Sequence, residues 1–192
     1  MTEGITWRSP LAAIGDATFA LPNGAASLED RSGTAKFSLR GDTTDGAFAT
    51  AVQTALGMAL PVEPNRTNGD GERTLLWLGP DEWLLVCPAA DNAAVEAALT
   101  AAELIATPVG EGRATIRLSG SRAVDVLRKG TSLDVHPGVF RPGHCAQTLL
   151  EQAAVLIHRL TEPAGYDIYC ERSVAEYLWR WLQDAAQEFQ TD

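Results

Sequence analysis

The chain has 192 residues, of which 45% are hydrophobic, and a formal net charge of −10 at pH 7. This apolar content predicts a folded core in one domain or two small ones, and it argues against disorder. The acidic balance disfavours nucleic acid and anionic membranes as partners, because both are negatively charged. No apolar run approaches the roughly 20 residues that cross a bilayer. The first residues lack the pattern of a secretory signal, and three cysteines suit free thiols in the cytoplasm.

Residues 1–30 carry proline, glycine and aspartate at short intervals, so we expect an irregular N-terminal arm rather than a separate module. Residues 34–40 alternate apolar and polar side chains, the pattern of a half-buried strand. A helix capped by Thr44 or Asp45 should follow and end near Gly57.

Residues 60–70 contain two prolines and predict a loop. Two apolar runs then flank residues 79–82 and predict a β-hairpin. Asp91 is expected to open a short alanine-rich helix, which a strand over residues 104–109 follows.

The segment from residue 112 onward repeats this plan. Ser121 is the expected N-cap of a helix that ends at Gly130. Further strands should be joined around residues 162–165. The last helix is expected to begin near Ser173, and its apolar face is predicted to contain Val174, Tyr177, Leu178, Trp181, Leu182 and Ala185.

Two stretches of sequence resemble each other, GTAKFSLRG (33–41) and GRATIRLSG (112–120), at an offset of 79 residues. Their glycines suit strand ends where the chain turns or approaches another backbone. We predict an α+β fold of two pseudo-symmetric β-α-β-β-α halves with packed sheets and outer helices. The halves cover about 33–109 and 110–190, and together they form a single domain over residues 31–192.

Motifs for phosphate, metal or nucleophilic chemistry are missing from the sequence. GEG at 110–112 precedes a strand and NGDG at 68–71 precedes no helix, so both are interpreted as turns. We therefore predict no catalytic, cofactor-binding or metal-binding residues in this chain.

The densest polar cluster consists of His136, Arg141, His144 and Cys145. It lacks the usual ligand spacing of a zinc site, and no base can be assigned to the cysteine. We interpret it as a loop with two surface histidines and a buried cysteine, and an enzyme that uses this loop is the least favoured hypothesis. His158 lies in an apolar strand and is interpreted as a core or interface histidine.

Five tryptophans are many for a chain without an evident ligand site. Trp77 and Trp83 flank the predicted hairpin turn. Trp179 lies outside the helical stripe that contains Trp181. A ring at this position must be covered by the N-terminal arm, covered by a partner, or left partly exposed to water. Because tryptophans at the border of a buried face are enriched at interfaces, we expect Trp179 to contact a partner.

Four phrases occur in order along the chain: LGPDEWLL (78–85), RLSGSRAVDVLRKGTSLDVHP (117–137), HCAQT (144–148) and YLWRWL (177–182). With them the sequence resembles the gamma subunit of heterotetrameric sarcosine oxidase, from about Phe37 to Leu182. The resemblance implies a fold similar to the folate-binding region of the aminomethyltransferase of the glycine cleavage system. That region has two related halves, which agrees with the internal repeat.

The resemblance also implies a role. In such oxidases the large alpha and beta subunits hold NAD, FAD and FMN, a small delta subunit carries zinc, and gamma binds no cofactor. The complex oxidatively demethylates sarcosine to glycine and passes the one-carbon unit to tetrahydrofolate or releases formaldehyde. We thus expect a cytoplasmic, non-catalytic gamma subunit that supports assembly with alpha, beta and delta. Two alternatives are a stand-alone folate-binding or aminomethyl-transferring protein, and a gamma-type subunit of a related N-methyl amino acid dehydrogenase.

Overall fold

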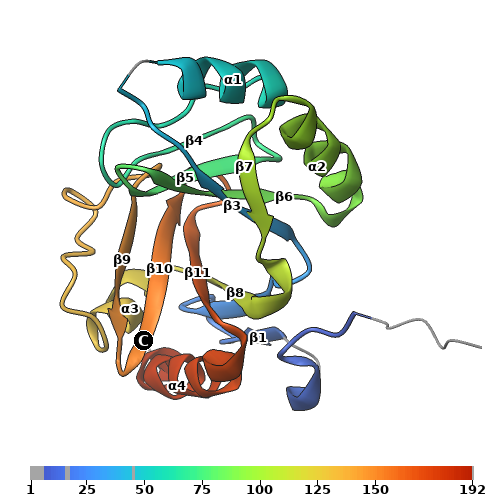
Figure 1. Ribbon diagram of the computed structural model, residues 1–192. Helices are drawn as coiled ribbons and strands as arrows, with labels where there is room; N and C mark the ends of the chain where they lie inside the picture. The colour runs from blue at the N-terminus through green and yellow to red at the C-terminus, as the bar shows by residue number, and fades with distance from the viewer. Residues whose placement is uncertain (1–6, 16–17, 45, 192) are drawn as a thin grey trace, which may run out of the picture.

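Two antiparallel sheets lie face to face, and helices cover their outer faces (Figure 1). The computed structural model describes residues 7–15, 18–44 and 46–191. The five-stranded sheet has the order β4-β5-β6-β3-β7 and the six-stranded sheet the order β1-β2-β8-β11-β10-β9. The strands are β1 (Thr18–Ala20), β2 (Ser27–Asp30), β3 (Ala35–Arg40), β4 (Thr67–Gly69), β5 (Thr74–Gly79), β6 (Glu82–Cys87), β7 (Ile105–Pro108), β8 (Arg113–Ser119), β9 (Cys145–Leu150), β10 (Ala153–Leu160) and β11 (Gly165–Glu171).

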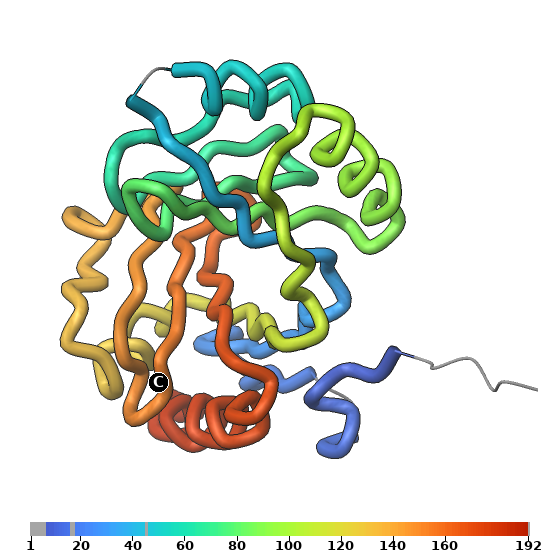
Figure 2. The backbone as a smooth tube through the Cα atoms, in the orientation of Figure 1, coloured from blue at the N-terminus to red at the C-terminus, as the bar shows by residue number. Residues whose placement is uncertain are grey.

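Four α-helices accompany the sheets: α1 (Ala47–Leu56), α2 (Asn92–Ala101), α3 (Ala123–Arg128) and α4 (Ala175–Gln187). Short 3-10 turns lie at Ala12–Ile14, Ala89–Asp91, Gly110–Gly112, Arg172–Val174 and Glu188–Thr191. In Figure 2 the chain from β3 to β7 forms the upper half of the molecule, and the later chain, with the N-terminal strands, forms the lower half. None of the described helices is long and apolar enough to cross a membrane.

Three layers of apolar side chains hold this arrangement together. One lies between the six-stranded sheet and helices α3 and α4, and another lies between the five-stranded sheet and helices α1 and α2. The third lies between the two sheets and is built from Leu76, Leu78, Leu84, Val86, Cys145, Leu156 and Tyr169. Each central strand is therefore covered on both faces.

Strand β3 shows this double covering most clearly. Its alternation predicted an outward polar face, but Lys36 is only 1% exposed because that face meets the second sheet. The Lys36 ammonium donates hydrogen bonds to the carbonyls of Ser32 and Thr34 at 3.1 and 3.0 Å. Burial lowers the pKa of Lys36 to about 8, and the charge of Asp30 partly offsets this effect.

The N-terminal segment is more regular than the irregular arm that was expected over residues 1–30. Strands β1 and β2 extend the six-stranded sheet, and β2 pairs with β8 from Ser27↔Ser119 to Asp30↔Ile116. The hydroxyls of Ser27 and Ser119 are 2.7 Å apart. An exposed edge of β8 would leave backbone groups unpaired, and β2 satisfies them. Residues 1–6 and 16–17 of the predicted arm lie outside the described part.

The expected loop over residues 60–70 is also partly wrong, because β4 pairs with β5 at its end. The predicted hairpin of β5 and β6 is present, and Trp77 lies opposite Trp83. Trp83 is fully buried, and its ring N–H donates to the carbonyl of Pro61 at 2.7 Å. The hairpin thereby holds the preceding loop against the sheet.

Two helix starts differ from the predicted caps. Helix α1 follows Gly46 rather than Thr44, while the alternative cap, Asp45, lies outside the described residues. Its end at Gly57, in the left-handed region at φ 73°, is as predicted. Helix α3 begins at Ala123, and Ser121 does not cap it. The backbone N–H of Ser121 instead donates to the carbonyl of Gly24, which ties this turn to the N-terminal loop.

The repeated glycines Gly41 and Gly120 lie where the chain is crowded. A Cβ at Gly41 would be 2.2 Å from the Phe48 ring. A Cβ at Gly120 would be 2.5 Å from the carbonyl oxygen of Ala25, and φ there is +113°. Both positions therefore require glycine.

Helix α4 turns a different face to the core than predicted. Trp179 is 2% exposed, whereas Tyr177 is 43% exposed and Trp181 is only partly buried. The N-terminal segment explains the shift, because Leu11 and Ile14 join the apolar core that contains Trp179. The expected contact of Trp179 with a partner is therefore wrong, and the alternative of a cover by the N-terminal segment is the one observed.

Candidate functional site

A row of polar side chains crosses the six-stranded sheet on the face that meets the other sheet. The strand register places Glu29 opposite Arg117, and Arg117 opposite Asp167. It also places His158 opposite both Asp167 and Cys145. Side chains directly opposite on antiparallel strands share one face, so these five residues form a continuous row, which we call the polar row.

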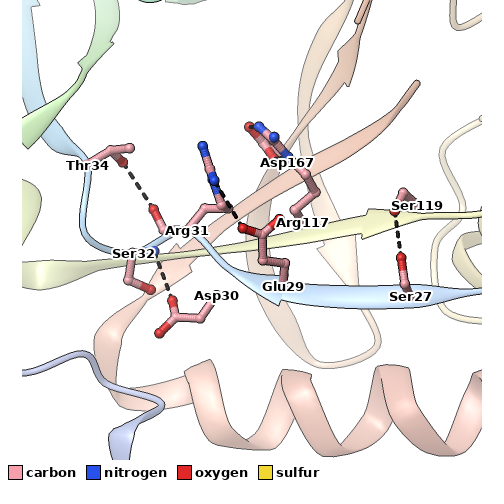
Figure 3. A network of polar contacts seen from close by, with 9 residues as sticks. All are labelled: Ser27, Glu29, Asp30, Arg31, Ser32, Thr34, Arg117, Ser119 and Asp167. Atoms are coloured by element: carbon pink, nitrogen blue, oxygen red, sulfur yellow. Dashed lines mark hydrogen bonds and ion pairs between the residues drawn. The ribbon is translucent and has the colours of Figure 1, made fainter. Parts of the chain in front are cut away.

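The centre of the polar row is an ion pair between Arg117 and Asp167 (Figure 3). Nε of Arg117 donates to Oδ1 of Asp167 at 2.7 Å, and Nη2 donates to Oδ2 at 2.8 Å. The side chains are 18% and 10% exposed. The hydrogen bonds to Asp167 raise the pKa of Arg117 against the opposing effect of burial. Such a two-point contact holds both groups in one orientation.

The same network continues to the N-terminal strand. Glu29 pairs with Arg31 at 3.0 Å, and the backbone N–H of Ser32 donates to Asp30 at 2.8 Å (Figure 3). The Ser32 hydroxyl in turn accepts a hydrogen bond from the N–H of Thr115. The segment after β2 is thus attached to β8 beside the ion pair.

His158 is the neighbour of Asp167 in the polar row, and it is 6% exposed. Burial lowers the pKa of His158 to about 4; Asp167 opposes this shift and Arg117 adds to it. Its Nε2 is 3.5 Å from Oγ1 of Thr67, whose hydroxyl donates to the carbonyl of Gly143. This hydrogen-bond pattern assigns the ring proton to Nε2 and leaves Nδ1 as an acceptor. No hydrogen-bond partner for Nδ1 occurs in the described part of the chain.

A cavity of about 560 Å³ lies between the two sheets beside the polar row. The hydroxyl of Thr115, a residue only 2% exposed, is also without a hydrogen-bond partner among the described residues. Glu72 and Glu162, which are exposed, also line this cavity. The buried and partly buried polar side chains of the lining are Arg31, Thr34, Thr67, Thr74, Thr115, Arg117, His158, Asp167 and Tyr169.

The loop cluster singled out from the sequence contains no activated group. His136 Nδ1 accepts the N–H of Gly138 at 3.1 Å, and Arg141 donates to the carbonyl of the same glycine at 3.1 Å. The His144 ring contacts Phe140 edge-on, at 5.8 Å between ring centres. Burial, with the charge of Arg66, lowers the pKa of His144. These contacts stabilise the loop itself.

Cys145 leaves this loop and begins β9, so the structure brings it next to His158 rather than to His136 or Arg141. Its thiol donates to the carbonyl of Trp77 at 3.4 Å. Burial raises the pKa of Cys145 to about 12. A neutral thiol beside a neutral imidazole is the reverse of the thiolate–imidazolium pair of a cysteine nucleophile.

The other cysteines are equally unsuited to covalent or metal chemistry. Burial raises the pKa of Cys87 to about 11 and that of Cys170 to about 12. Within the described ranges, no three or more His, Cys, Asp or Glu side chains are grouped so as to hold a metal ion. The arrangement between the sheets thus offers hydrogen bonds and a neutralised ion pair.

Sequence reasoning missed the polar row, although its signal was present. Arg117, Asp167 and His158 are polar residues in otherwise apolar strands. His158 was interpreted as a core or interface histidine, but its neighbours Arg117 and Asp167 were not singled out, because only the pairing of the strands and the packing of the second sheet bring the three together.

Comparison with known proteins identifies the family. The model of the family described as "Sarcosine oxidase, gamma subunit family" matches residues 40–188. The chain belongs to this family. A gamma subunit of sarcosine oxidase from Corynebacterium sp. (strain P-1) is 36% identical over 157 residues, which are 77% of this chain and 73% of the relative. The gamma subunit from Corynebacterium sp. (strain U-96) is 33% identical over 193 residues, which are 95% of this chain and 91% of the relative.

Solved structures agree with this assignment to the sarcosine oxidase gamma subunits. A chain of heterotetrameric sarcosine oxidase from Corynebacterium sp. U-96, in complex with pyrrole 2-carboxylate, superposes with a TM-score of 0.86 at 30% identity. The match covers 97% of each chain. The glycine cleavage system aminomethyltransferase T from Bartonella henselae has a TM-score of 0.61 at 18% identity, over 83% of this chain and 45% of that one. The chain therefore shares its α+β fold with part of that enzyme.

Proposed function

We propose that this chain is a non-catalytic gamma subunit that supports assembly of a flavin-containing heterotetrameric sarcosine oxidase. The observation that carries the proposal is the superposition over 97% of both chains on a component of such an oxidase. Its partners would be the alpha, beta and delta subunits. FAD, FMN, NAD, zinc and tetrahydrofolate would belong to those partners, and the complex would demethylate sarcosine to glycine.

The chemistry between the sheets supports a non-catalytic role. The high pKa of Cys145 and the low pKa of His158 leave both groups uncharged at neutral pH. Arg117 and Asp167 neutralise each other. Because no nucleophile is activated here, the site does not favour an enzyme that acts alone.

We also propose that the chain consists of two related halves. The order β4-β5-β6-β3-β7 in one sheet parallels β9-β10-β11-β8-β2 in the other, with β7 and β2 in equivalent places. Cutting the chain near Val109 and superposing the halves should align residues 33–41 with 112–120. If the two segments occupied different places after superposition, the proposal of duplication would fail.

We place the protein in the cytoplasm, supported by three buried cysteines that are all unpaired. Cell fractionation followed by immunoblotting tests the location. A periplasmic or extracellular fraction that contains the protein would contradict it.

The decisive experiment for the main proposal is co-expression with the large flavin subunits of a heterotetrameric sarcosine oxidase. We expect the chain to co-purify with them in a fixed ratio, and sarcosine-dependent oxygen consumption to require the assembled complex. Large subunits that assemble and oxidise sarcosine equally well without the chain would contradict the role in assembly.

The substrate of the complex separates this proposal from the alternative of a dehydrogenase subunit. The same complex assayed with N-methylglutamate and other N-methyl amino acids would reveal a gamma-type subunit of a related dehydrogenase. A stand-alone folate-binding or aminomethyl-transferring protein is the second alternative. It would instead bind tetrahydrofolate tightly as a purified single chain.

A further inference from the structure

We propose that the outer edge of β7 is a docking site, where an extended segment of a large oxidase subunit adds a sixth strand to the five-stranded sheet. The segment would carry apolar side chains at alternate positions. The inference rests on the proposed role in assembly and names a surface that serves it. It is carried by the unequal borders of the two sheets, by the outward backbone groups of β7 and by the apolar surface beside them.

The two sheets differ at one border. β7 lies outside β3 and β2 lies outside β8, so these two strands occupy equivalent places, and β1 covers β2. In the part of the chain that the structure describes, no strand covers β7, which forms the border of its sheet (Figure 1). Among the described strands, β1 thus has no counterpart beside β7.

The repeated segments identify the residue that an added strand would pair with. At the offset of 79 residues, Leu39 corresponds to Leu118. Ala106 lies opposite Leu39, and Leu28 lies opposite Leu118. Leu28 in turn lies opposite Phe19 of β1. Ala106 is therefore the counterpart of a residue that has a further strand beside it.

The backbone of Ala106 points away from β3. The N–H of Val109 donates to the carbonyl of Lys36 at 2.9 Å. Hydrogen-bonded and non-hydrogen-bonded pairs alternate along an antiparallel ladder, so Ala106, three residues earlier, belongs to a non-hydrogen-bonded pair. Its N–H and C=O therefore face the border, where an added strand can bind them. Pro108 has no N–H at the next outward position, and the pairing of β1 with β2 also ends before the equivalent place.

Apolar surface lies on both faces of this edge. Ile105 is 68% exposed, and it lies on the same face of the sheet as Lys36. On the helix face a groove of about 390 Å³ adjoins the end of β7, and its apolar lining includes Trp7, Ala35, Ala89 and Pro108. Its charged lining residues are Lys36, which is buried and bonded to backbone carbonyls, and Glu111. Successive side chains of a strand point to opposite faces, so one set would contact Ile105 and the other would meet the groove.

Charge distinguishes a partner subunit from a second copy of this chain. Arg40, opposite Ile105, pairs with Asp81 and Glu82 at 3.3 and 2.9 Å. Glu103, two residues before Ile105, is exposed. The charged side chains at this end of the edge therefore sum to a negative charge, and the whole chain carries −10. A second copy would bring two acidic edges together, which their repulsion disfavours. A segment of a large subunit is the occupant that remains.

Hydrogen–deuterium exchange of the full chain, alone and in the complex assembled by co-expression, tests the proposal. The amide of Ala106 should exchange rapidly in the isolated chain, because it faces the border of the sheet. In the complex we expect its exchange to slow at least tenfold, because the added strand supplies a backbone acceptor. Unchanged exchange at Ala106 in the complex would overturn the proposal.

Matched variants locate the contact. Ala106→Pro removes the outward N–H and should weaken co-purification with the large subunits at least tenfold. Pro108 occupies the next outward position of the same strand, so the edge accommodates proline. Ala106→Ser keeps the N–H and should assemble as the parent does. If Ala106→Pro does not fold, exchange at Ala106 in the parent complex decides the question by itself.

The outcomes separate this proposal from the role in assembly. A parent chain that fails to co-purify with the large subunits would overturn both. A parent that co-purifies, together with an Ala106→Pro variant that co-purifies equally well, would overturn only the docking site. A dimer of the isolated parent chain that Ala106→Pro abolishes would show that a second copy occupies the edge, and it would also overturn the proposal.

Discussion

Arg117 on β8 and Asp167 on β11 lie opposite each other and share two hydrogen bonds, of 2.7 and 2.8 Å, in the space between the two sheets. The pair is largely shielded from water, so each charge depends on the other. Removal of either charge should therefore lower the free energy of unfolding by a measurable amount.

Asp167→Ala should destabilise the chain by about 3 kcal/mol or more, because it leaves the Arg117 guanidinium buried without its counter-charge. The measurement is urea unfolding of the full-length chain. The double variant Arg117→Met with Asp167→Leu should recover most of the loss. As a control, Glu176→Ala breaks the exposed pair with Arg180 and should cost less than about 1 kcal/mol. Equal losses in the two single variants would contradict the burial argument.

Stability should fall as the pH drops from about 6.5 to about 4, because the unfolded chain takes up a proton at His158 in this range while the folded chain does not. The lowered pKa corresponds to a loss of up to about 3 kcal/mol across that window. His158→Gln should flatten the slope between these pH values, whereas His136→Gln, an exposed position, should preserve it. Unfolding by urea at several pH values measures the slope. An unchanged slope in His158→Gln would show that the histidine is already charged in the folded state.

Trp179→Ala should destabilise the isolated chain by about 3–5 kcal/mol, because the ring is buried between α4 and the N-terminal segment. Tyr177→Ala, two positions earlier on the exposed face, should change stability by no more than about 0.5 kcal/mol. Thermal unfolding followed by tryptophan fluorescence or circular dichroism distinguishes the two variants. A stable Trp179→Ala chain would mean that the N-terminal segment does not cover the ring in solution.

Contacts with the large subunits are expected on the exposed apolar side chains of the second half. Tyr177 on α4 is 43% exposed and Val139 in the loop before β9 is 57% exposed. Tyr177→Glu and Val139→Glu should each weaken co-purification with the large subunits tenfold or more, because a charge would be buried at the interface. Val62→Glu, at a 62% exposed position in the first half, is the matched control. Loss of binding in Val62→Glu alone would move the interface to the first half.

The purified chain should be colourless and should not bind FAD, FMN or NAD tightly in calorimetry. The sequence offers no phosphate-cradling loop, and its charge of −10 disfavours phosphate groups. A stoichiometric flavin spectrum that persists after dialysis would contradict the prediction.

The sequence by itself determined the local elements and the family. The hairpin of β5 and β6 and the end of α1 at Gly57 follow from turn residues and from patterns only a few residues long. Such features depend on residues that are close together in the sequence. The phrases from LGPDEWLL to YLWRWL were sufficient to suggest the sarcosine oxidase gamma subunits, and the family match over residues 40–188 confirms that assignment.

Only the tertiary structure decided what each face of an element meets. An alternating pattern shows which side chains share a face of a strand, but water and a second sheet are equally compatible with it. Lys36 was therefore assigned to a polar outer face and lies inside, whereas His158 is buried as expected of a core or interface histidine. The burial of Trp179 depends in the same way on a segment more than 160 residues earlier in the chain. The polar row joins the consecutive strands β9, β10 and β11 to β8 and β2, which lie much earlier in the chain. No local pattern contains that information, because it arises only when the strands pair.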